Sequence, residues 1–417
     1  MTKAVTGRKR QSKEVRPRGV VRRMGDESEG RYPMSLASDQ APRPDRAIDW
    51  PALMSELGPR FAARADNYDA TDAFVAENFA ELKARDVFAA GVPSELGGGG
   101  ASYSQLCDML RTLAHYCGST ALTLSMHTHA VATIVWRWRR DPKPLQDFLR
   151  RIVHDRLVLV VSGASDWLNS SGAAQRVAGG WRVNGKKIFA SGSPFGDLLM
   201  TQAVDQASAA EAVVLHFPIS LRNGDVEVQD TWHVLGMRGT GSHDVVIKDA
   251  FVPESAISLR RPQGEWTPAF HLFACTIPLP LVYAVYLGVA EAARDKALVL
   301  ARKRAHEPGM PYLVGEMENE LACARMAHRD MVEAAEACEE PGPETTNRIV
   351  VARTLVGRAV TSVAEKAMEV AGGSSFYRAS GLERLFRDIQ GARFHRPQER
   401  AQLRFSGRLA LGLDLDE

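Results

Sequence analysis

Three histidines in two short segments are the residues of this sequence best suited to move protons. His127 and His129 stand in "SMHTHA", and His395 stands in "RFHRPQERAQ". An imidazole titrates near neutral pH, so it can give or take a proton during a reaction. A spacing of two residues on a helix turns His127 and His129 roughly 200° apart, so they cannot share a metal ion. We predict no metal site. His127 is either a core residue or a group that faces substrate, and His395 is either catalytic or a helix-start residue bonded to backbone.

Hydroxyl groups are concentrated in three glycine-containing stretches. These are "VVSGASD" (160–166), "KIFASGSP" (187–194) and "LGMRGTGSHDVVIKDAFVP" (235–253). Each is typical of a turn beside a strand, where serine and threonine form local hydrogen bonds. In the third stretch, Arg238 is available for an ion pair. Taken alone, these stretches are ordinary structural loops.

The elements that must position these groups change period twice along the chain. From about Trp50 to Arg151, apolar residues recur at helical spacing, with a glycine-rich break at "GVPSELGGGG". Short β-branched or alternating runs follow, and helical spacing returns from about Glu265. This order predicts an α+β fold. We expect an N-terminal helical domain over 48–155, a central β domain over 156–262 and a C-terminal helical bundle over 263–417.

This order of elements and the "LGMRGTGSHDV" stretch resemble the acyl-CoA dehydrogenase superfamily over about residues 48–413. The resemblance implies a flavin between the β domain and the C-terminal helices. Ser162 and Ser165 match the residues that bond the isoalloxazine edge. Phe189 and Ser191 match the aromatic side chain and hydroxyl that flank the ring. A flat apolar ring needs an apolar wall, and its polar edge needs hydrogen-bonding groups.

The residue expected to act as base departs from the dehydrogenases. They carry a Glu in a "YEG" motif past a "GG" loop, and here that place is taken by His395. A second group of dehydrogenases carries the Glu on an earlier helix, where this chain has Pro278 and no acidic residue over 266–290. A histidine at the first place resembles the flavin monooxygenases of the superfamily, such as dibenzothiophene monooxygenase. The resemblance therefore implies a two-component monooxygenase that uses reduced flavin and oxygen, with His395 and His127 as catalytic candidates.

The residues expected around the far end of the cofactor are also altered. Dehydrogenases that bind FAD hold its pyrophosphate and adenosine with polar residues, where this chain has Glu369, Pro397 and Glu399. Two carboxylates would repel a pyrophosphate. Arg304 still matches the phosphate-binding arginine of the family. The "GG" loop is kept as Gly372 and Gly373. We therefore favour FMN over FAD.

Composition, charge and cysteine spacing indicate where the protein is located. The 417 residues are 45% hydrophobic and carry a net charge of +2, and the five cysteines show no CxxC spacing, which indicates a reducing, cytoplasmic location. Residues 1–33 hold ten Lys/Arg and four Asp/Glu. We predict that 1–47 is a disordered basic extension; it is an idle extension ahead of a start at Met34, a solvated tail, or a contact for nucleic acid or membrane. The uncharged run 272–290 is predicted to be a buried core helix and not a membrane span.

The expected partners are a small-molecule substrate, oxygen, a separate flavin reductase, and further copies of the chain in a homodimer or homotetramer. No membrane association is expected, and nucleic-acid binding is disfavoured. Two alternatives stay open. One is an acyl-CoA dehydrogenase with a relocated base, and the other is a non-catalytic DNA-binding flavoprotein that uses the basic tail.

Overall fold

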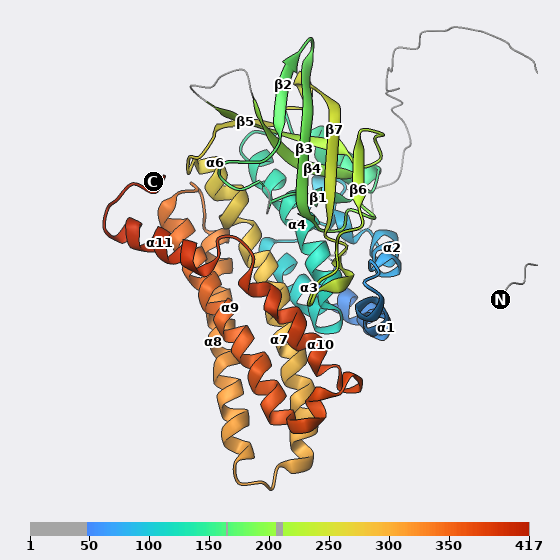
Figure 1. The fold of residues 1–417 in the computed structure, drawn as a ribbon, viewed down its shortest axis with the longest axis vertical. Coiled ribbons are helices and arrows are strands. Elements are labelled where there is room, and N and C mark those ends of the chain that lie inside the picture. The colour runs from blue at the N-terminus through green and yellow to red at the C-terminus, as the bar shows by residue number, and fades with distance from the viewer. Residues whose placement is uncertain (1–47, 164–165, 206–211, 417) are drawn as a thin grey trace, which may run out of the picture. The chain divides into compact units, whose positions relative to one another are not determined.

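The computed structural model describes residues 48–163, 166–205 and 212–416. The predicted basic extension and Ser165 lie outside these ranges. The described part begins with a helical domain (Figure 1). Its helices are α1 (Trp50–Thr71), α2 (Ala76–Ala84), α3 (Tyr103–Tyr116), α4 (Gly118–Trp138) and α5 (Gln146–His154).

Local signals account for where these helices begin. Asp49 caps α1 by accepting a hydrogen bond from the Ala52 amide at 3.0 Å. Ser102 and Gln105 form a reciprocal capping box at the start of α3. The glycine-rich break before α3 permits close backbone packing, because a Cβ on Gly99 would lie 2.3 Å from the Trp50 ring.

A mixed sheet of eight strands follows within the described ranges. The strands are β1 (Leu159–Val161), β2 (Ala173–Val177), β3 (Gly180–Ala190), β4 (Leu198–Asp205), β5 (Val213–Ser220), β6 (Val226–Gln229), β7 (His243–Pro253) and β8 (Leu259–Pro262). Their order is β6-β7-β3-β2-β4-β5-β8, and β1 pairs in parallel with β4. The β3–β7 pair runs from Gly180 opposite Pro253 to Ala190 opposite His243. These two long strands end beside each other, so the loops that follow Ala190 and precede His243 are neighbours.

The C-terminal domain is helical again. It contains α6 (Pro268–His271), α7 (Pro278–Ala301), α8 (Met310–Glu336), α9 (Pro343–Ala371), α10 (Leu382–Ile389) and α11 (Glu399–Ala410). Helix α7 contacts α3, α4, α8, α9 and α10 (Figure 1). Gly288 permits this packing, because a Cβ there would lie 2.1 Å from the Arg111 carbonyl oxygen on α3.

The uncharged run 272–290 lies in the interior. Within the described ranges, only the continuous helical segment Pro268–Arg304 is long and apolar enough to cross a membrane, and 89% of its most apolar window is buried in the protein. Residues Leu272–Thr276 form a π-helical turn, and α7 starts afresh at Pro278. Proline is well accommodated in the first turn of a helix, so Pro278 and Pro280 mark its start.

Candidate active site

Ser162 lies at the end of β1 and is buried. Its hydroxyl contacts the Asp166 carboxylate and the Thr201 hydroxyl, the latter at 2.7 Å. Thr201 also donates to Asp166 at 3.0 Å. Thr201 donates its proton to Asp166, and Ser162 has Asp166 and Thr201 as acceptors for its single proton, so a lone pair on Ser162 Oγ stays available for an N–H group. This suits the predicted contact with the flavin edge.

Asp166 in turn binds a fully buried lysine. Lys187 Nζ lies 2.6 Å from Asp166 Oδ1, and it also donates to the carbonyl oxygens of Ser171 at 2.6 Å and Gln202 at 2.5 Å. Burial lowers the pKa of Lys187, and the charge of Asp166 opposes that shift. We call Ser162, Asp166, Ser171, Lys187, Thr201 and Gln202 the Lys187–Asp166 cluster.

Phe189 and Ser191 follow at the end of β3. Phe189 has a φ of 56°, is 50% exposed, and packs edge-on against Trp232 at 5.6 Å between ring centroids. A non-glycine residue in the left-handed region is strained, and such strain persists where the surrounding structure imposes it. Ser191 Oγ lies 2.7 Å from Ser242 Oγ, which lies 2.7 Å from Thr240 Oγ1. An exposed aromatic wall beside a chain of hydroxyls fits the predicted environment of a flat ring.

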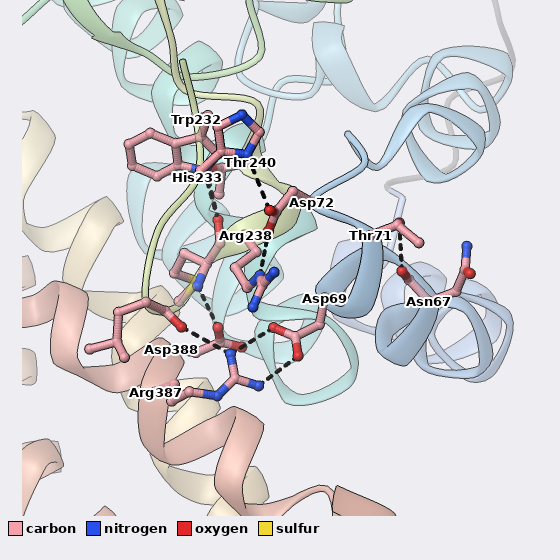
Figure 2. A network of polar contacts seen from close by, with 12 residues as sticks. Asn67, Asp69, Thr71, Asp72, Trp232, His233, Arg238, Thr240, Arg387 and Asp388 are labelled. Atoms are coloured by element: carbon pink, nitrogen blue, oxygen red, sulfur yellow. Dashed lines mark hydrogen bonds and ion pairs between the residues drawn. The ribbon is translucent and has the colours of Figure 1, made fainter. Parts of the chain in front are cut away.

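The loop between β6 and β7 carries Thr240 and Ser242, and charged groups at α1 and α10 anchor it (Figure 2). Arg238 pairs with Asp72, which follows α1, as the predicted ion pair of this stretch. Arg387 of α10 forms a bidentate pair with Asp69 of α1 at 2.6 and 2.9 Å. Asp388 accepts a hydrogen bond from the Met237 amide at 2.5 Å. Burial raises the pKa of Asp388 to about 6, although Arg384 opposes the shift.

His127 and His129 point in different directions from α4. His127 Nε2 lies 2.7 Å from the Phe88 carbonyl oxygen, and its Nδ1 accepts from the Leu159 amide at 2.9 Å. Both nitrogens are thus bonded to backbone, so the contacts of His127 favour the core interpretation.

His129 is partly buried, and its ring has no hydrogen-bond partner among the described residues. Burial lowers the pKa of His129 to about 3, and the charges of His127 and His395 add to the effect.

His395 is partly buried in the segment between α10 and α11. Its Nε2 lies 2.7 Å from the hydroxyl oxygen of Tyr286 on α7. Burial lowers the pKa of His395 to about 4, and the nearby Arg353 guanidinium adds to the shift. The ring is therefore neutral at neutral pH. It bonds to a side chain and not to backbone, which contradicts the helix-start alternative.

Of the residues predicted to lie around the far end of the cofactor, some are neighbours in the structure and others are not. Arg304 chelates Glu307 at 2.7 and 2.8 Å, and its Nη1 would lie 2.8 Å from a Cβ on Gly372, whose φ is 64°. Only glycine fits here, so Arg304 and Gly372 form one surface, and Gly373 follows in the same turn. Glu369 pairs with Lys366 at 3.3 Å, and Glu399 pairs with Arg358. The hydroxyls and the aromatic wall beside the sheet fit a flavin ring, whereas Arg304 and Gly372 lie at the end of the C-terminal bundle away from the sheet (Figure 1).

A surface cavity lies elsewhere. It has a volume of about 440 Å³ and is lined by residues of α1, α3 and α7, including Arg111 and Glu291, which pair with each other. None of the candidate site residues lines it.

Comparison with known families gives the class of the protein. Models of the acyl-CoA dehydrogenase N-terminal, middle and C-terminal domains match residues 57–141, 162–250 and 281–399, in that order. The chain belongs to the acyl-CoA dehydrogenase superfamily, as predicted. The predicted three-domain fold is confirmed.

The named relatives of the chain differ in the activities that their names give. It is 27% identical to a putative acyl-CoA dehydrogenase of Bacillus subtilis over 86% of this chain and 95% of the relative. It is 29% identical to an amino sugar nitrososynthase of Streptomyces rubradiris over 91% and 96%. The predicted likeness to dibenzothiophene monooxygenase is confirmed by the Mycolicibacterium goodii enzyme, which is 24% identical over 82% and 89%.

Among solved structures, KijD3 in complex with FMN and a dTDP-linked amino sugar superposes with a TM-score of 0.81. The identity is 25%, and the match covers 89% of this chain and 96% of KijD3. The relative in that structure holds FMN, the flavin favoured by the sequence.

Three residues of the candidate site were not predicted from the sequence: His129, Tyr286 and Arg353. Helical spacing showed that His127 and His129 face apart, but not which of them faces the core and which faces the candidate site. The two tyrosines of "LVYAVYLG" were a usable signal, because a buried tyrosine hydroxyl needs a partner.

Proposed function

We propose that this protein is a flavin-dependent monooxygenase that takes reduced FMN from a separate reductase and oxidises a small organic substrate with oxygen. The single observation that carries the proposal is the position, hydrogen bond and protonation state of His395. The place of the dehydrogenase base holds a neutral, partly buried imidazole bonded to Tyr286. The alternative base position, Pro278, is a buried helix start without a carboxylate.

Bound reduced flavin would supply electrons to oxygen, and the protein would control where protons go. Ser162 would accept a hydrogen bond from an N–H of the flavin edge, since its own proton has acceptors in Asp166 and Thr201. Phe189 and Trp232 would cover the ring and exclude water. His395 and His129 are uncharged at neutral pH, and each offers a ring N–H for hydrogen bonding. In a homo-oligomer, Arg304 beside Gly372 would bind a phosphate of the flavin held by a neighbouring copy of the chain.

The remaining expectations belong to this proposal. Homo-oligomerisation, as a dimer or tetramer, and a cytoplasmic location stay predictions. The DNA-binding alternative depends on the basic tail alone, which lies outside the described residues.

A reductase-coupled assay tests the proposal. Reduced FMN and oxygen are supplied with indole, dibenzothiophene or a dTDP-linked amino sugar, and oxygenated product and hydrogen peroxide are measured. We expect product with at least one substrate. His395→Ala should lower product formation by about 10² or more, with peroxide released instead. His154→Ala is the matched control, because His154 is exposed and its one polar side-chain contact within the described ranges is with its neighbour Asp155.

The dehydrogenase alternative predicts a different result. Anaerobic bleaching of the protein-bound flavin by an acyl-CoA at about 1 per second or faster, with no oxygenated product, would contradict the monooxygenase proposal.

A further inference from the structure

We propose that Tyr286 is a positioning residue that donates its hydroxyl proton to His395 Nε2 and thereby holds the His395 proton on Nδ1. Nδ1–H is then the donor that this histidine presents to the cofactor and substrate. The inference rests on the proposed function for the role of His395, but its structural part can be tested separately.

The geometry is that of a direct hydrogen bond between two rings. Tyr286 Oη lies 2.7 Å from His395 Nε2, and the ring centroids are 5.4 Å apart at an angle of 60°. Tyr286 is fully buried in the part of α7 where every residue from Pro278 to Ala290 is buried. A phenol in this position has little freedom to turn elsewhere.

The direction of the bond follows from the partners available. Among the described residues, His395 Nε2 is the one hydrogen-bond partner of Tyr286 Oη. If Nε2 carried the proton, the buried tyrosine hydrogen would have no acceptor, which is a costly arrangement. If Tyr286 donates, both groups are satisfied. Burial raises the pKa of Tyr286 well above its usual value, so the hydroxyl keeps its proton.

Neutral His395 must then carry its proton on Nδ1. No group in the described ranges bonds to Nδ1. This nitrogen is therefore free to bond to a group other than the described residues. In the proposed function that partner is the cofactor or the substrate.

The backbone around His395 is fixed independently of its ring. Arg353 Nη2 donates to the carbonyl oxygens of His395 at 2.6 Å and Ala392 at 3.2 Å. Tyr283, one turn before Tyr286, donates to the same Ala392 oxygen at 2.6 Å. We call Tyr283, Tyr286, Arg353 and His395 the His395 cluster. Its two tyrosines are equally buried, but one bonds to backbone and the other to the imidazole.

This difference supplies a matched pair of variants, Tyr286→Phe and Tyr283→Phe. The readout is the tautomer of His395 in the FMN-loaded protein, measured by long-range ¹H–¹⁵N correlation spectra of ¹⁵N-histidine-labelled protein at pH 7.5. The chain has eleven histidines, so His395 is assigned by comparison with His395→Gln. We expect Nδ1–H in the unmodified protein. Tyr286→Phe should lower the ratio of Nδ1–H to Nε2–H by about tenfold, and Tyr283→Phe should leave it unchanged.

Three outcomes would overturn the inference. These are an Nε2–H tautomer in the unmodified protein, an unchanged ratio in Tyr286→Phe, or the same change in both variants. The first outcome is measured on the unmodified protein, so it would contradict the proposal even if Tyr286→Phe did not fold.

A second measurement separates this inference from the proposed function. Hydrogen peroxide released per reduced FMN should rise severalfold in Tyr286→Phe and stay near the unmodified level in Tyr283→Phe. A tautomer change in a protein without oxygen chemistry would refute the proposed function and support the Tyr286–His395 assignment alone. Product formation together with an unchanged tautomer ratio in Tyr286→Phe would support the proposed function and refute the Tyr286–His395 assignment.

Discussion

The Lys187–Asp166 cluster and the His395 cluster each bury a cation beside the candidate flavin site, but only the first pairs its cation with a carboxylate. Lys187 is fully buried and bonds to a carboxylate and two carbonyl oxygens. Arg353 is also buried, but its hydrogen bonds to described residues go to carbonyl oxygens, and its Cζ lies 5.2 Å from the centroid of the Tyr283 ring. Its Nε has no partner in the described part of the chain.

The two arrangements have different consequences. On the sheet side, charge is neutralised within the cluster, so the cluster holds Ser162 in place without adding net charge. On the helical side, the charge of Arg353 has no carboxylate within ion-pair distance among the described residues, and it helps lower the pKa of His395. The sheet therefore supplies geometry, and the helices set the protonation state of the site.

The largest effect is expected from breaking the compensated pair. Lys187→Met leaves the Asp166 charge buried without a cation, and such changes cost about 3–5 kcal/mol. The free energy of unfolding is measured by urea denaturation. Lys186→Met is the control, because Lys186 pairs with Asp244 at 2.7 Å on the surface and should cost less than about 1 kcal/mol. Equal losses in the two variants would show that the buried pair has no special role.

A second test concerns a buried charge on the helical side. Asp388 has an ordinary pKa of 3.8 and a folded-state pKa of about 6, so the folded state binds more protons between these values. Its contribution to stability is therefore greatest at low pH and falls as pH rises from about 4 to 6, by up to about 1.4 kcal/mol per pH unit. His395 and His129 act in the opposite direction, because their lowered pKa values make the unfolded state bind more protons.

Asp388→Asn removes the first contribution and keeps an acceptor for the Met237 amide. We expect this variant to lose stability more steeply than the unmodified protein on acidification from pH 6 to pH 4. Denaturation curves at intervals of half a pH unit measure the difference. Parallel pH profiles would mean that Asp388 is ionised in both states over this range.

Much of the fold was predictable from periodicity and turn chemistry. The "SHDVVIKDAFVP" run became β7, and the change from helices to strands and back to helices follows the predicted order. These features depend on residues near one another in the chain. The buried run 272–290 was predicted for the same reason, because an uncharged segment with two prolines and a charged flank packs best inside the protein.

The site was predictable only in part. The resemblance pointed to Ser162, Phe189, Ser191, Arg304 and His395, but contacts between distant segments decide what these residues do. Tyr286 and His395 are separated by 109 positions, and nothing local relates them. The choice between His127 and His129 depends on which face of α4 meets β1 and Phe88. Helical spacing alone cannot supply that information.

The smallest expected effect, and the one that most sharpens the comparison, concerns the hydroxyl that the sheet-side cluster holds. Ser162→Ala removes the proposed acceptor for the flavin N–H and leaves the Lys187–Asp166 pair intact. One hydrogen bond is worth about 0.5–1.5 kcal/mol, so the dissociation constant for FMN should rise about tenfold at most, with little change in the free energy of unfolding. Fluorescence titration with FMN measures the change. Ser170→Ala is the matched control, since Ser170 also bonds to Asp166, at 3.4 Å, but matches no flavin contact. If Ser170→Ala weakens FMN binding as much as Ser162→Ala, then Ser162 acts through Asp166 and not through direct contact with the flavin. If only Ser162→Ala does, the sheet side supplies a placed hydroxyl, and control of protonation stays with the helical side.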